Sequence, residues 1–349
     1  MEARDRLSGA ACDVCVAFAS GTHVAEAEAT LAVIGETLEP AQAIGCAASG
    51  VLADGREIER DTGVSVWAAS LNGASATAFR CERSLPDLDG ADGAVLLADP
   101  RDFPADALLP SLPGVPVLGG LASAGDAALF LDGEALRGGA VGLRFDGVDI
   151  VACVSQGAAP LGPELTITAA EGNVILELAG RPAYAMLQKV AEQLPAEEQT
   201  LLERSGGVLL GIVVEANKPE YVQGDFLVRP VIGADTRTGA VAVGAMVRPG
   251  QVVRLHARDA ASADRDLRRA LDSRSAGFEP AGALVFACNG RGTGMFGVPD
   301  HDALAVAQGI GGAPSAGFFA AGEIGPVGSE TFLHGFTATV ALFGHALTA

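Results

Sequence analysis

The sequence lacks any apolar run long enough to cross a membrane. Its longest apolar runs, such as 94–98 and 284–287, have the length of β-strands, whereas a spanning helix needs about 18 or more residues. The charged start of the chain, Met1-Glu-Ala-Arg-Asp-Arg6, is not followed by an apolar segment of signal-peptide type. These absences predict a cytoplasmic protein that makes no contact with membranes.

Positive charge is scarce. Lys and Arg together number 23 against 43 Asp and Glu, so the formal net charge is −20, and Lys189 and Lys218 are the only lysines. A nucleic acid or an anionic membrane would repel such a surface, so neither is expected as a partner. The scarcity of Lys beside abundant Ala, Gly and Arg is typical of a GC-rich bacterial genome.

Cysteines and aromatics are also few. Six cysteines in 349 residues do not make a disulfide framework. Cys12 and Cys15 form one CxxC with no second Cys or His pair, so the sequence predicts no metal site. Only 5% of residues are aromatic, which argues against the wide apolar walls of a haem cleft.

Apolar residues are abundant, at 49%, and the length suffices for two domains with large cores. Strand-like and helix-like segments alternate, with Gly, Pro and Asp turns every ten to fifteen residues or so. The helical segments are too few to cover two large parallel sheets on both faces. We therefore expect an α+β fold of two related mixed, largely antiparallel sheets stacked face to face, with helices outside. The expected strands are 12–19, 43–47, 64–71, 93–98, 117–118, 140–145, 150–155, 208–215, 226–232, 241–246 and 251–257, and the expected helices are 24–38, 105–109, 182–194 and 264–271.

An internal repeat relates the two halves. Residues 93–100 resemble 282–289, and Gly119 and Gly317 follow similar Gly-x-Pro turns at the same spacing. The segments 136–138 and 333–335 each precede a predicted strand. This pattern predicts a duplication in which the second half carries more polar groups.

The C-terminal quarter carries the charged and reactive side chains on glycine-rich turns. Arg291 lies between Gly290 and Gly292, and its planar fork suits a carboxylate. Glu323 lies on a second tight turn and could hold an ammonium group. The pair would recognise both ends of an amino acid, although each side chain could equally brace its own turn.

Cys288 and His334 leave several alternatives open. Cys288 ends a strand and could be a nucleophile with His334 as base and Glu323 as orienting group, or it could simply pack. His334 could bond a ligand, pack in the core or ligate haem.

Apolar side chains complete the predicted small-molecule site. Met295, Phe296 and Phe318 are its expected walls, with core packing the alternative for Phe318. The glycines of 290–294 do not fit a Walker motif. The predicted ligand-binding set, which includes no catalytic and no metal-ligating residue, is Cys288, Asn289, Arg291, Gly292, Met295, Phe296, Phe318, Glu323 and His334.

These motifs together resemble the FIST family. The resemblance rests on Gly45-Cys46-Ala-Ala-Ser49-Gly50, Gly119-Gly120, Gln156-Gly157, Gly180-Arg181-Pro182-Ala183, Phe226-Leu227-Val228-Arg229 and above all on the segments around 283–297, 317–326 and 332–337. It implies a FIST N-terminal domain over 1–180 and a FIST C domain over 181–349. The sequence departs from the family pattern at Gly50-Val51-Leu52 and at Ala179-Gly180, where Gly-Glu-Ile after the turn and Asp-Gly are usual.

The resemblance implies a sensory and signal-transduction protein that binds a small metabolite, with amino acids as the proposed ligands. We expect a stand-alone cytoplasmic copy that binds its ligand in the C-terminal half, signals to a partner protein and needs no cofactor. The sequence favours a binding protein but leaves an enzyme open. The alternatives are a haem-binding nitric-oxide sensor, as some FIST relatives are, a Cys-dependent hydrolase or transferase, and a protein-interaction scaffold without a small ligand.

Overall fold

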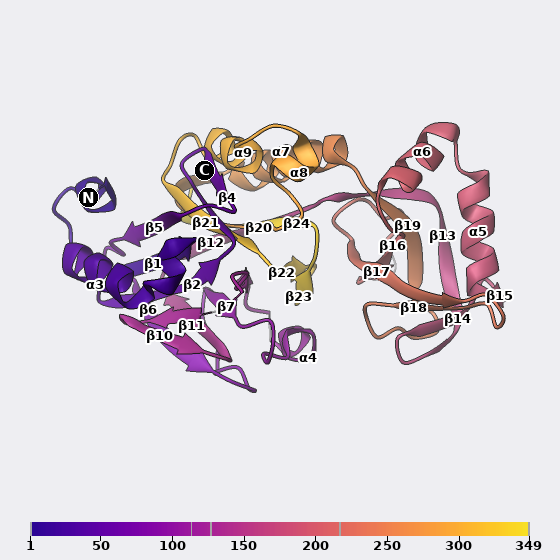
Figure 1. The fold of residues 1–349 in the computed structure, drawn as a ribbon, viewed down its shortest axis with the longest axis horizontal. Helices are drawn as coiled ribbons and strands as arrows, with labels where there is room; N and C mark the ends of the chain where they lie inside the picture. The colour runs from indigo at the N-terminus through magenta and orange to yellow at the C-terminus, as the bar shows by residue number, and fades with distance from the viewer. Residues whose placement is uncertain (1, 113, 126–127, 216–217, 348–349) are drawn as a thin grey trace. The chain divides into compact units, whose positions relative to one another are not determined.

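The computed structural model describes residues 2–112, 114–125, 128–215 and 218–347. They form two compact units (Figure 1), the first made of 1–155 with 267–349 and the second of 156–266. The predicted boundary between residues 180 and 181 therefore falls inside the second unit. The α+β class with mixed, largely antiparallel sheets is confirmed, but the described residues form four sheets where two were expected. None of the described helices is both long and apolar enough to span a membrane.

The first unit contains three copies of one strand arrangement. Each copy has two parallel strands: β1 with β2, β7 with β8, and β20 with β21. A further strand pairs antiparallel with the first of them: β5 with β1, β11 with β7, and β24 with β20. The first copy contains β1 (Val14–Ser20), β2 (Gln42–Ala48), β3 (Gly50–Ala53), β4 (Arg56–Glu59), β5 (Gly63–Ala69) and β6 (Ser75–Cys81). The second contains β7 (Gly93–Ala98), β8 (Val117–Leu121), β9 (Ala128–Leu131), β10 (Glu134–Arg137), β11 (Ala140–Asp146) and β12 (Asp149–Gln156), and the third β20 (Phe278–Cys288), β21 (Ser315–Ala320), β22 (Glu323–Val327), β23 (Glu330–His334) and β24 (Thr337–Ala346).

The three copies exchange hairpins. In each copy a hairpin follows the second parallel strand, yet it pairs with the second strand of a different copy. Hairpin β3–β4 extends the sheet of β21, β9–β10 extends that of β2, and β22–β23 extends that of β8. The exchange is cyclic, so each sheet of the first unit contains strands from at least two copies. The largest core cluster contains residues of all three sheets, including Phe18, Val95 and Phe286.

The repeat predicted between the second and third copies therefore matches the strand layout, and β1 to β5 form a further copy. Each parallel pair places a glycine opposite a first-strand residue: Gly45 opposite Ala17, Gly119 opposite Leu96 and Gly317 opposite Val285. A Cβ at any of these glycines would lie within 2 Å of that residue's carbonyl oxygen. The close approach requires glycine at all three positions.

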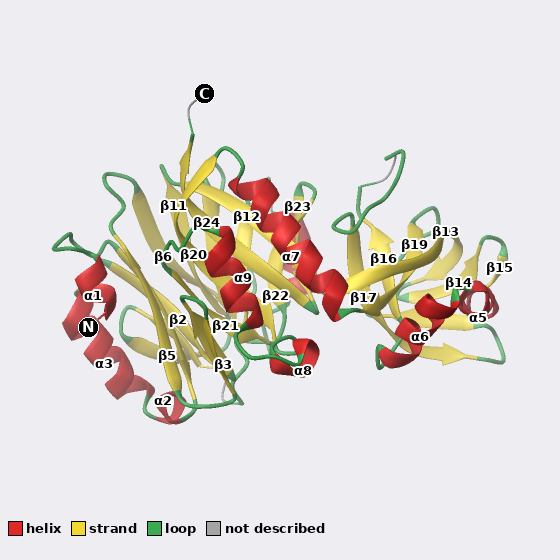
Figure 2. Cartoon of the chain, turned by 90° about the horizontal axis from the view of Figure 1, so that it is seen from above, coloured by secondary structure: helices red, strands yellow, loops and turns green. Residues whose placement is uncertain are grey.

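Helices connect the parallel strands, as a parallel crossover requires. The helices of the first unit are α1 (Glu2–Arg6), α2 (Thr22–Ala25), α3 (Ala27–Leu38), α4 (Ala105–Leu108) with the 3-10 helix η1 (Leu109–Ser111), α8 (Thr293–Phe296) and α9 (His301–Gly309). It also includes α7 (Ala260–Ser275) from Leu267 onward. Helices α7 and α9 lie across the sheet that contains β20, β21 and β24 (Figure 2). Leu267, Leu271 and Val306 pack there against Val285 and Val340.

The second unit is an antiparallel barrel. Its strands follow the order β13, β19, β16, β17, β18, β14, and pairing of β13 with β14 closes the ring. Its elements are β13 (Ala158–Glu171), β14 (Val174–Leu178), β15 (Arg181–Pro182), α5 (Ala183–Gln193), α6 (Ala196–Arg204), β16 (Leu209–Val213), β17 (Phe226–Asp235), β18 (Ala240–Val243) and β19 (Val252–Arg258). Leu187 and Val190 of α5 pack onto its core beside Leu255.

Candidate functional site

The loops at the carboxyl ends of the three parallel pairs meet in the first unit. Ser49 follows β2, Ser123 follows β8 and Asn289 follows β20. The Ser49 hydroxyl donates to Asn289 Oδ1 at 2.7 Å, and the Ser49 N–H donates to Ser123 Oγ at 2.9 Å. Ser123 Oγ in turn donates to the carbonyl of Phe319, at the end of β21. One hydrogen-bonded chain thus links all three copies of the strand arrangement.

Arg291, two residues after Asn289, forms a buried ion pair with Asp302. Its side chain is fully buried, with Nε 2.5 Å from Asp302 Oδ2 and Nη2 2.9 Å from Oδ1. Burial opposes ionisation of Asp302, but the guanidinium and the contact with His301 hold the pKa of Asp302 down at about 2. The Arg291 Nη1 atom is also buried and has no hydrogen-bond partner among the described residues.

Helix α8 covers the guanidinium. The Phe296 ring lies 5.2 Å from Arg291 Cζ and stacks on the His301 ring with a centroid distance of 3.4 Å. Glu59 of β4 holds the start of α8, because its Oε1 accepts the N–H and the hydroxyl of Thr293 at 2.8 and 2.7 Å. The short helix lies between Gly292 and Gly297, which adopt φ values of 65° and 71°. Positive φ favours glycine at both ends of this cover.

Glu323 is a second buried charge, at the start of β22. Its Oε2 accepts the hydroxyl of Thr337 at 2.7 Å and the N–H of Thr337 at 3.0 Å. No N–H or O–H of the described chain donates to Oε1. Burial raises the pKa of Glu323 to about 7, although the hydrogen bonds from Thr337, the contact with the Cys288 thiol and the Arg291 charge oppose the rise.

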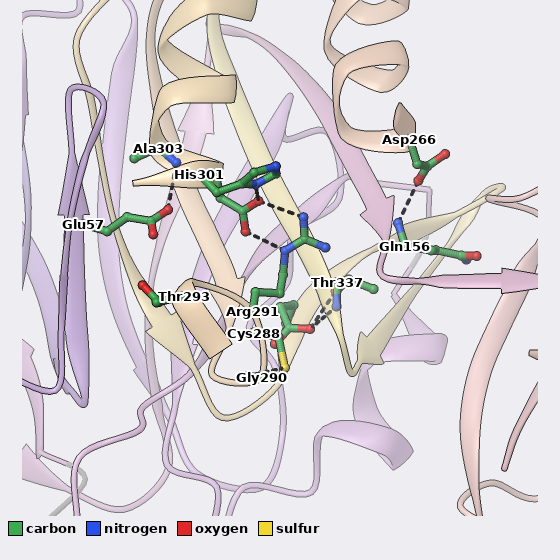
Figure 3. A network of polar contacts seen from close by, with 12 residues as sticks. Glu57, Gln156, Asp266, Cys288, Gly290, Arg291, Thr293, His301, Ala303 and Thr337 are labelled. Atoms are coloured by element: carbon green, nitrogen blue, oxygen red, sulfur yellow. Dashed lines mark hydrogen bonds and ion pairs between the residues drawn. The ribbon is translucent and has the colours of Figure 1, made fainter. Parts of the chain in front are cut away.

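Cys288 is the neighbour of Glu323 in this cluster. The N–H of Gly290 lies 3.5 Å from its sulfur. Figure 3 shows this contact together with Arg291 and Thr337. Burial and the nearby Glu323 raise the pKa of the Cys288 thiol to about 12. The thiol is therefore protonated at neutral pH, and a nucleophilic role would require a base to remove its proton.

His334 lies directly opposite Glu323 in the antiparallel pair of β22 and β23. Its ring is buried, and Nε2–H donates to the carbonyl of Gly325 at 3.0 Å. A haem iron at Nε2 would have to break this bond, so the His334 ring as placed does not fit an axial ligand through that atom. The described residues also bring together no group of three or more His, Cys, Asp or Glu side chains suited to a metal ion.

Glu57 of β4 adds a half-buried carboxylate, whose Oε2 atom is itself buried without a hydrogen-bond partner among the described residues. Its Oε1 accepts the N–H of Ala303 in the first turn of α9 at 3.0 Å, and its own N–H donates to Asp300 Oδ1 at 2.7 Å. Burial raises the pKa of Glu57 to about 7, with the charges of Asp302 and Glu59 adding to the rise. The hairpin β3–β4 thus holds the starts of both α8 and α9.

The structure gathers most of the predicted residues in one region and leaves one in the core. Arg291, Cys288, Glu323 and His334 are buried, Gly292 and Phe296 cover them, and Asn289 is exposed, while Met295 is half-buried on α8. Phe318 lies in the hydrophobic core, where its ring stacks on Phe18 at 4.9 Å. The ligand-binding roles of the nine residues stay predictions.

Several contacts of this region were not predicted from the sequence. Ser49 and Ser123 both end the pattern Gly-x-x-Ala-Ser, at 45–49 and 119–123, and this shared pattern could have pointed to them. Asp302, Thr337 and Glu57 carry no such signal, because they come from separate elements that only the fold brings together.

Comparison with family models finds two consecutive matches, the FIST N domain over residues 13–181 and the FIST C domain over residues 183–326. The chain belongs to the FIST family. FIST domains are in general sensory and signal-transduction domains. The two FIST matches meet near residue 182, inside the barrel, so the structural units and the family domains divide the chain differently.

Relatives extend over nearly the whole FIST chain. An uncharacterized protein of Mycobacterium tuberculosis (strain CDC 1551 / Oshkosh) is 42% identical over 365 residues, which cover 98% of this chain and 94% of that protein. An uncharacterized protein of Mycobacterium bovis (strain ATCC BAA-935 / AF2122/97) is 40% identical over 366 residues, covering 98% and 93% respectively.

Proposed function

We propose that this FIST chain is a cytoplasmic sensory protein that binds a small zwitterionic metabolite, such as an amino acid, in the C-terminal part of its first unit. One observation carries the proposal: Arg291 Nη1 and Glu323 Oε1 are both buried and have no hydrogen-bond partner among the described residues. Buried polar atoms are rarely left in that state, because each costs about 1–3 kcal/mol. A ligand with a carboxylate and an ammonium group would satisfy both atoms.

The chemistry of the two atoms sets the expected orientation of the ligand. Nε and Nη2 of the Arg291 guanidinium already donate to Asp302, so Nη1 is the atom that could donate to a ligand carboxylate. Glu323 would accept the ammonium group through Oε1. A bound cation would favour the ionised carboxyl group, which lowers the pKa of Glu323 from its raised value of about 7.

Entry of a ligand requires movement of α8. Phe296 covers Arg291, and the bonds from Thr293 to Glu59 hold the helix in place. Gly292 and Gly297 give the backbone freedom at both ends of α8. Displacement of this exposed turn would change a surface that a signalling partner protein could read.

A thermal-shift screen of amino acids and matched simple carboxylates tests the proposal. Ligands that bind the folded state raise the melting temperature, and the stabilisation grows with the logarithm of their excess over the dissociation constant. We expect hits among amino acids. The Glu323→Gln variant, which retains the side-chain volume but not the charge, should lose these shifts, whereas Glu57→Gln should retain them as the matched control.

Hydrogen exchange adds a second readout, because a ligand under α8 should change amide protection over residues 288–297. Two results would contradict the proposal: no thermal shift with any amino acid, or shifts that Glu323→Gln leaves intact. Two alternatives are checked with the same sample. A Soret absorption band lost in His334→Ala would favour haem, and a turnover lost in Cys288→Ser would favour an enzyme.

A further inference from the structure

We propose that the free edge of β5 accepts an extended segment of a partner protein as an added antiparallel strand. Strand β5 is an outermost strand of its sheet, where it pairs with β1 on one side only. The unpaired backbone groups of an outer strand are a template for another strand. Three independent features of the first unit mark this edge as a binding surface.

The first feature is the repeated strand arrangement. Strands β11 and β24 correspond to β5 in the second and third copies, and each has an additional neighbour, β6 beside β11 and β12 beside β24. The pairing of β6 with β11 is antiparallel over seven residues. In the described part of the chain, the corresponding position beside β5 holds no strand. The fold therefore has the geometry for one more strand at this edge.

The second feature is the absence of charge. The other outermost strands of the three sheets are β4, β6, β10, β12 and β23, and each carries at least one charged residue. Charged side chains on outer strands oppose pairing with other chains. Strand β5, with the sequence Gly63-Val-Ser-Val-Trp-Ala-Ala69, carries neither a charge nor a proline. Its edge thus lacks the usual protection against strand addition.

The third feature is a groove along the same edge. A cavity of about 530 Å³ is lined by residues 64–69 of β5 and the two residues that follow it, by α1 and Leu7, and by residues 281–282 and 343–345 of β20 and β24. One wall of this groove covers the face of β5 that carries Val66, and Leu7 packs beside Val66 there. The other wall includes Phe343, whose ring is 4.8 Å from that of Trp67. With a wall on each face the edge is recessed, so a single extended strand fits better than the sheet of a folded second copy.

The groove also indicates the composition of the segment. Its walls are rich in small residues, including Ala68, Gly282 and Gly344, so the added strand should carry small side chains. The charged groups at its rim are Glu2, Asp54 and Arg6, of which Arg6 already pairs with both acids. The net charge of the chain is −20, which favours a segment with basic residues. Strand β6, Ser75-Ala-Thr-Ala-Phe-Arg-Cys81, has this composition.

The test uses a fluorescein-labelled peptide with the sequence of residues 74–80, Ala-Ser-Ala-Thr-Ala-Phe-Arg, titrated with the full-length protein. We expect a saturable rise in anisotropy. The Val64→Lys variant, which places a charge at an exposed position of β5, should weaken binding by at least about tenfold. Val33→Lys, at an exposed position of α3, is the matched control and should bind as the wild type does. The same peptide carrying Thr77→Pro should bind more weakly, because proline cannot donate a ladder hydrogen bond.

Two outcomes would overturn the proposal. One is the absence of saturable binding up to a protein concentration of about 1 mM, where even weak recognition is detectable. The other is binding that Val64→Lys leaves unchanged, which would place the peptide elsewhere. Light scattering identifies the competing occupant: a mass of twice 35.1 kDa that Val64→Lys converts to the monomer would mean that a second copy occupies the edge instead. None of these readouts depends on the metabolite site.

Discussion

The loops after β7 and β20 occupy equivalent places in two copies of the same strand arrangement, yet their charges are used differently. Asp99 and Cys288 each stand three residues beyond the strand position that faces the close-packed glycine. Asp99 is buried, and it accepts Arg101 Nε at 2.9 Å and Nη2 at 2.7 Å. The Arg101 side chain is half exposed, so water completes its solvation. The Asp99–Arg101 ion pair of this loop is therefore complete in itself and stabilises the turn.

In the loop after β20 the arginine, Arg291, points into the protein interior. Arg291 is fully buried, its partner Asp302 is eleven residues away on α9, and two buried polar atoms of the region, Arg291 Nη1 and Glu323 Oε1, have no partner among the described residues. The same strand arrangement therefore holds an ion pair with all partners present after β7. After β20 it holds a polar cluster in which some buried atoms have no hydrogen-bond partner in the described part of the chain. Of these two loops, the one after β20 is near the unpaired atoms on which the proposed ligand site rests.

The largest expected effect comes from breaking the buried pair. Asp302→Ala should lower the free energy of unfolding by about 3–5 kcal/mol, because it leaves the Arg291 charge buried without its partner. Urea unfolding at neutral pH measures the change. A loss below about 1 kcal/mol, typical of an exposed pair, would show that Arg291 reaches water in solution.

The close-packed glycines test whether the copies share one scaffold. Gly119→Ala and Gly317→Ala should each lower the free energy of unfolding by about 2–3 kcal/mol, because the new Cβ would lie 1.8 or 1.9 Å from a carbonyl oxygen. Gly35→Ala in α3 is the control, since nothing lies within 4 Å of its added Cβ. Unequal losses at Gly119 and Gly317 would break the equivalence of the two loops.

The pH dependence of stability sharpens the contrast between the loops. The folded-state pKa of Glu323 is raised from 4.5 to about 7, so between these pH values the folded protein retains a proton that the unfolded chain has lost. The free energy of unfolding should therefore fall as pH rises through this window and level off above it. Glu323→Gln should remove part of that fall, on the order of 2 kcal/mol. Urea unfolding at pH 5 and pH 8 measures it.

Glu57→Gln is the informative control for this experiment, because the pKa of Glu57 is also raised to about 7. Each single variant should remove its own share of the fall in stability. A Glu323→Gln protein with the pH profile of the wild type would mean that Glu323 titrates normally in the folded state.

The smallest effect is expected for the Asp99–Arg101 ion pair. Arg101→Ala should change the free energy of unfolding by less than about 1 kcal/mol, because the lost partner is half exposed and screened by solvent. Thermal unfolding at two salt concentrations measures it. A loss as large as that of Asp302→Ala would remove the distinction between the two loops.

Local patterns predicted the positions of the expected elements well, although more strands and helices are present than were expected. The apolar run 93–98, bounded by Asp92 and Asp99-Pro100, predicts a strand with those bounds, and the structure contains it. The expected helix over 182–194 is observed at 183–193. Period and turn chemistry determine such elements, because both act over a few neighbouring residues.

Long-range pairing could not be predicted in the same way. The bond between Ser49 and Asn289 joins residues 240 positions apart, and the hairpin exchange that creates it leaves no local pattern. The copy formed by β1 to β5 was missed because its Ala and Gly content resembles that of many segments. The prediction of two sheets was wrong for this reason: hairpins of one copy extend the sheet of another, so the first unit has three sheets, and the barrel adds a fourth.

The cyclic exchange of hairpins has a consequence for how the chain reaches its native state. The N–H of Ser315 donates to Asp54 Oδ1 across 261 residues. Strand β12 pairs with β24, which follows the entire barrel in the sequence. On the ribosome, the first two copies would emerge with the sheet that receives β3 and β4 not yet synthesised. Such high contact order slows folding and leaves strand edges open to aggregation. We expect truncated chains that end before β20 to depend on chaperones for solubility.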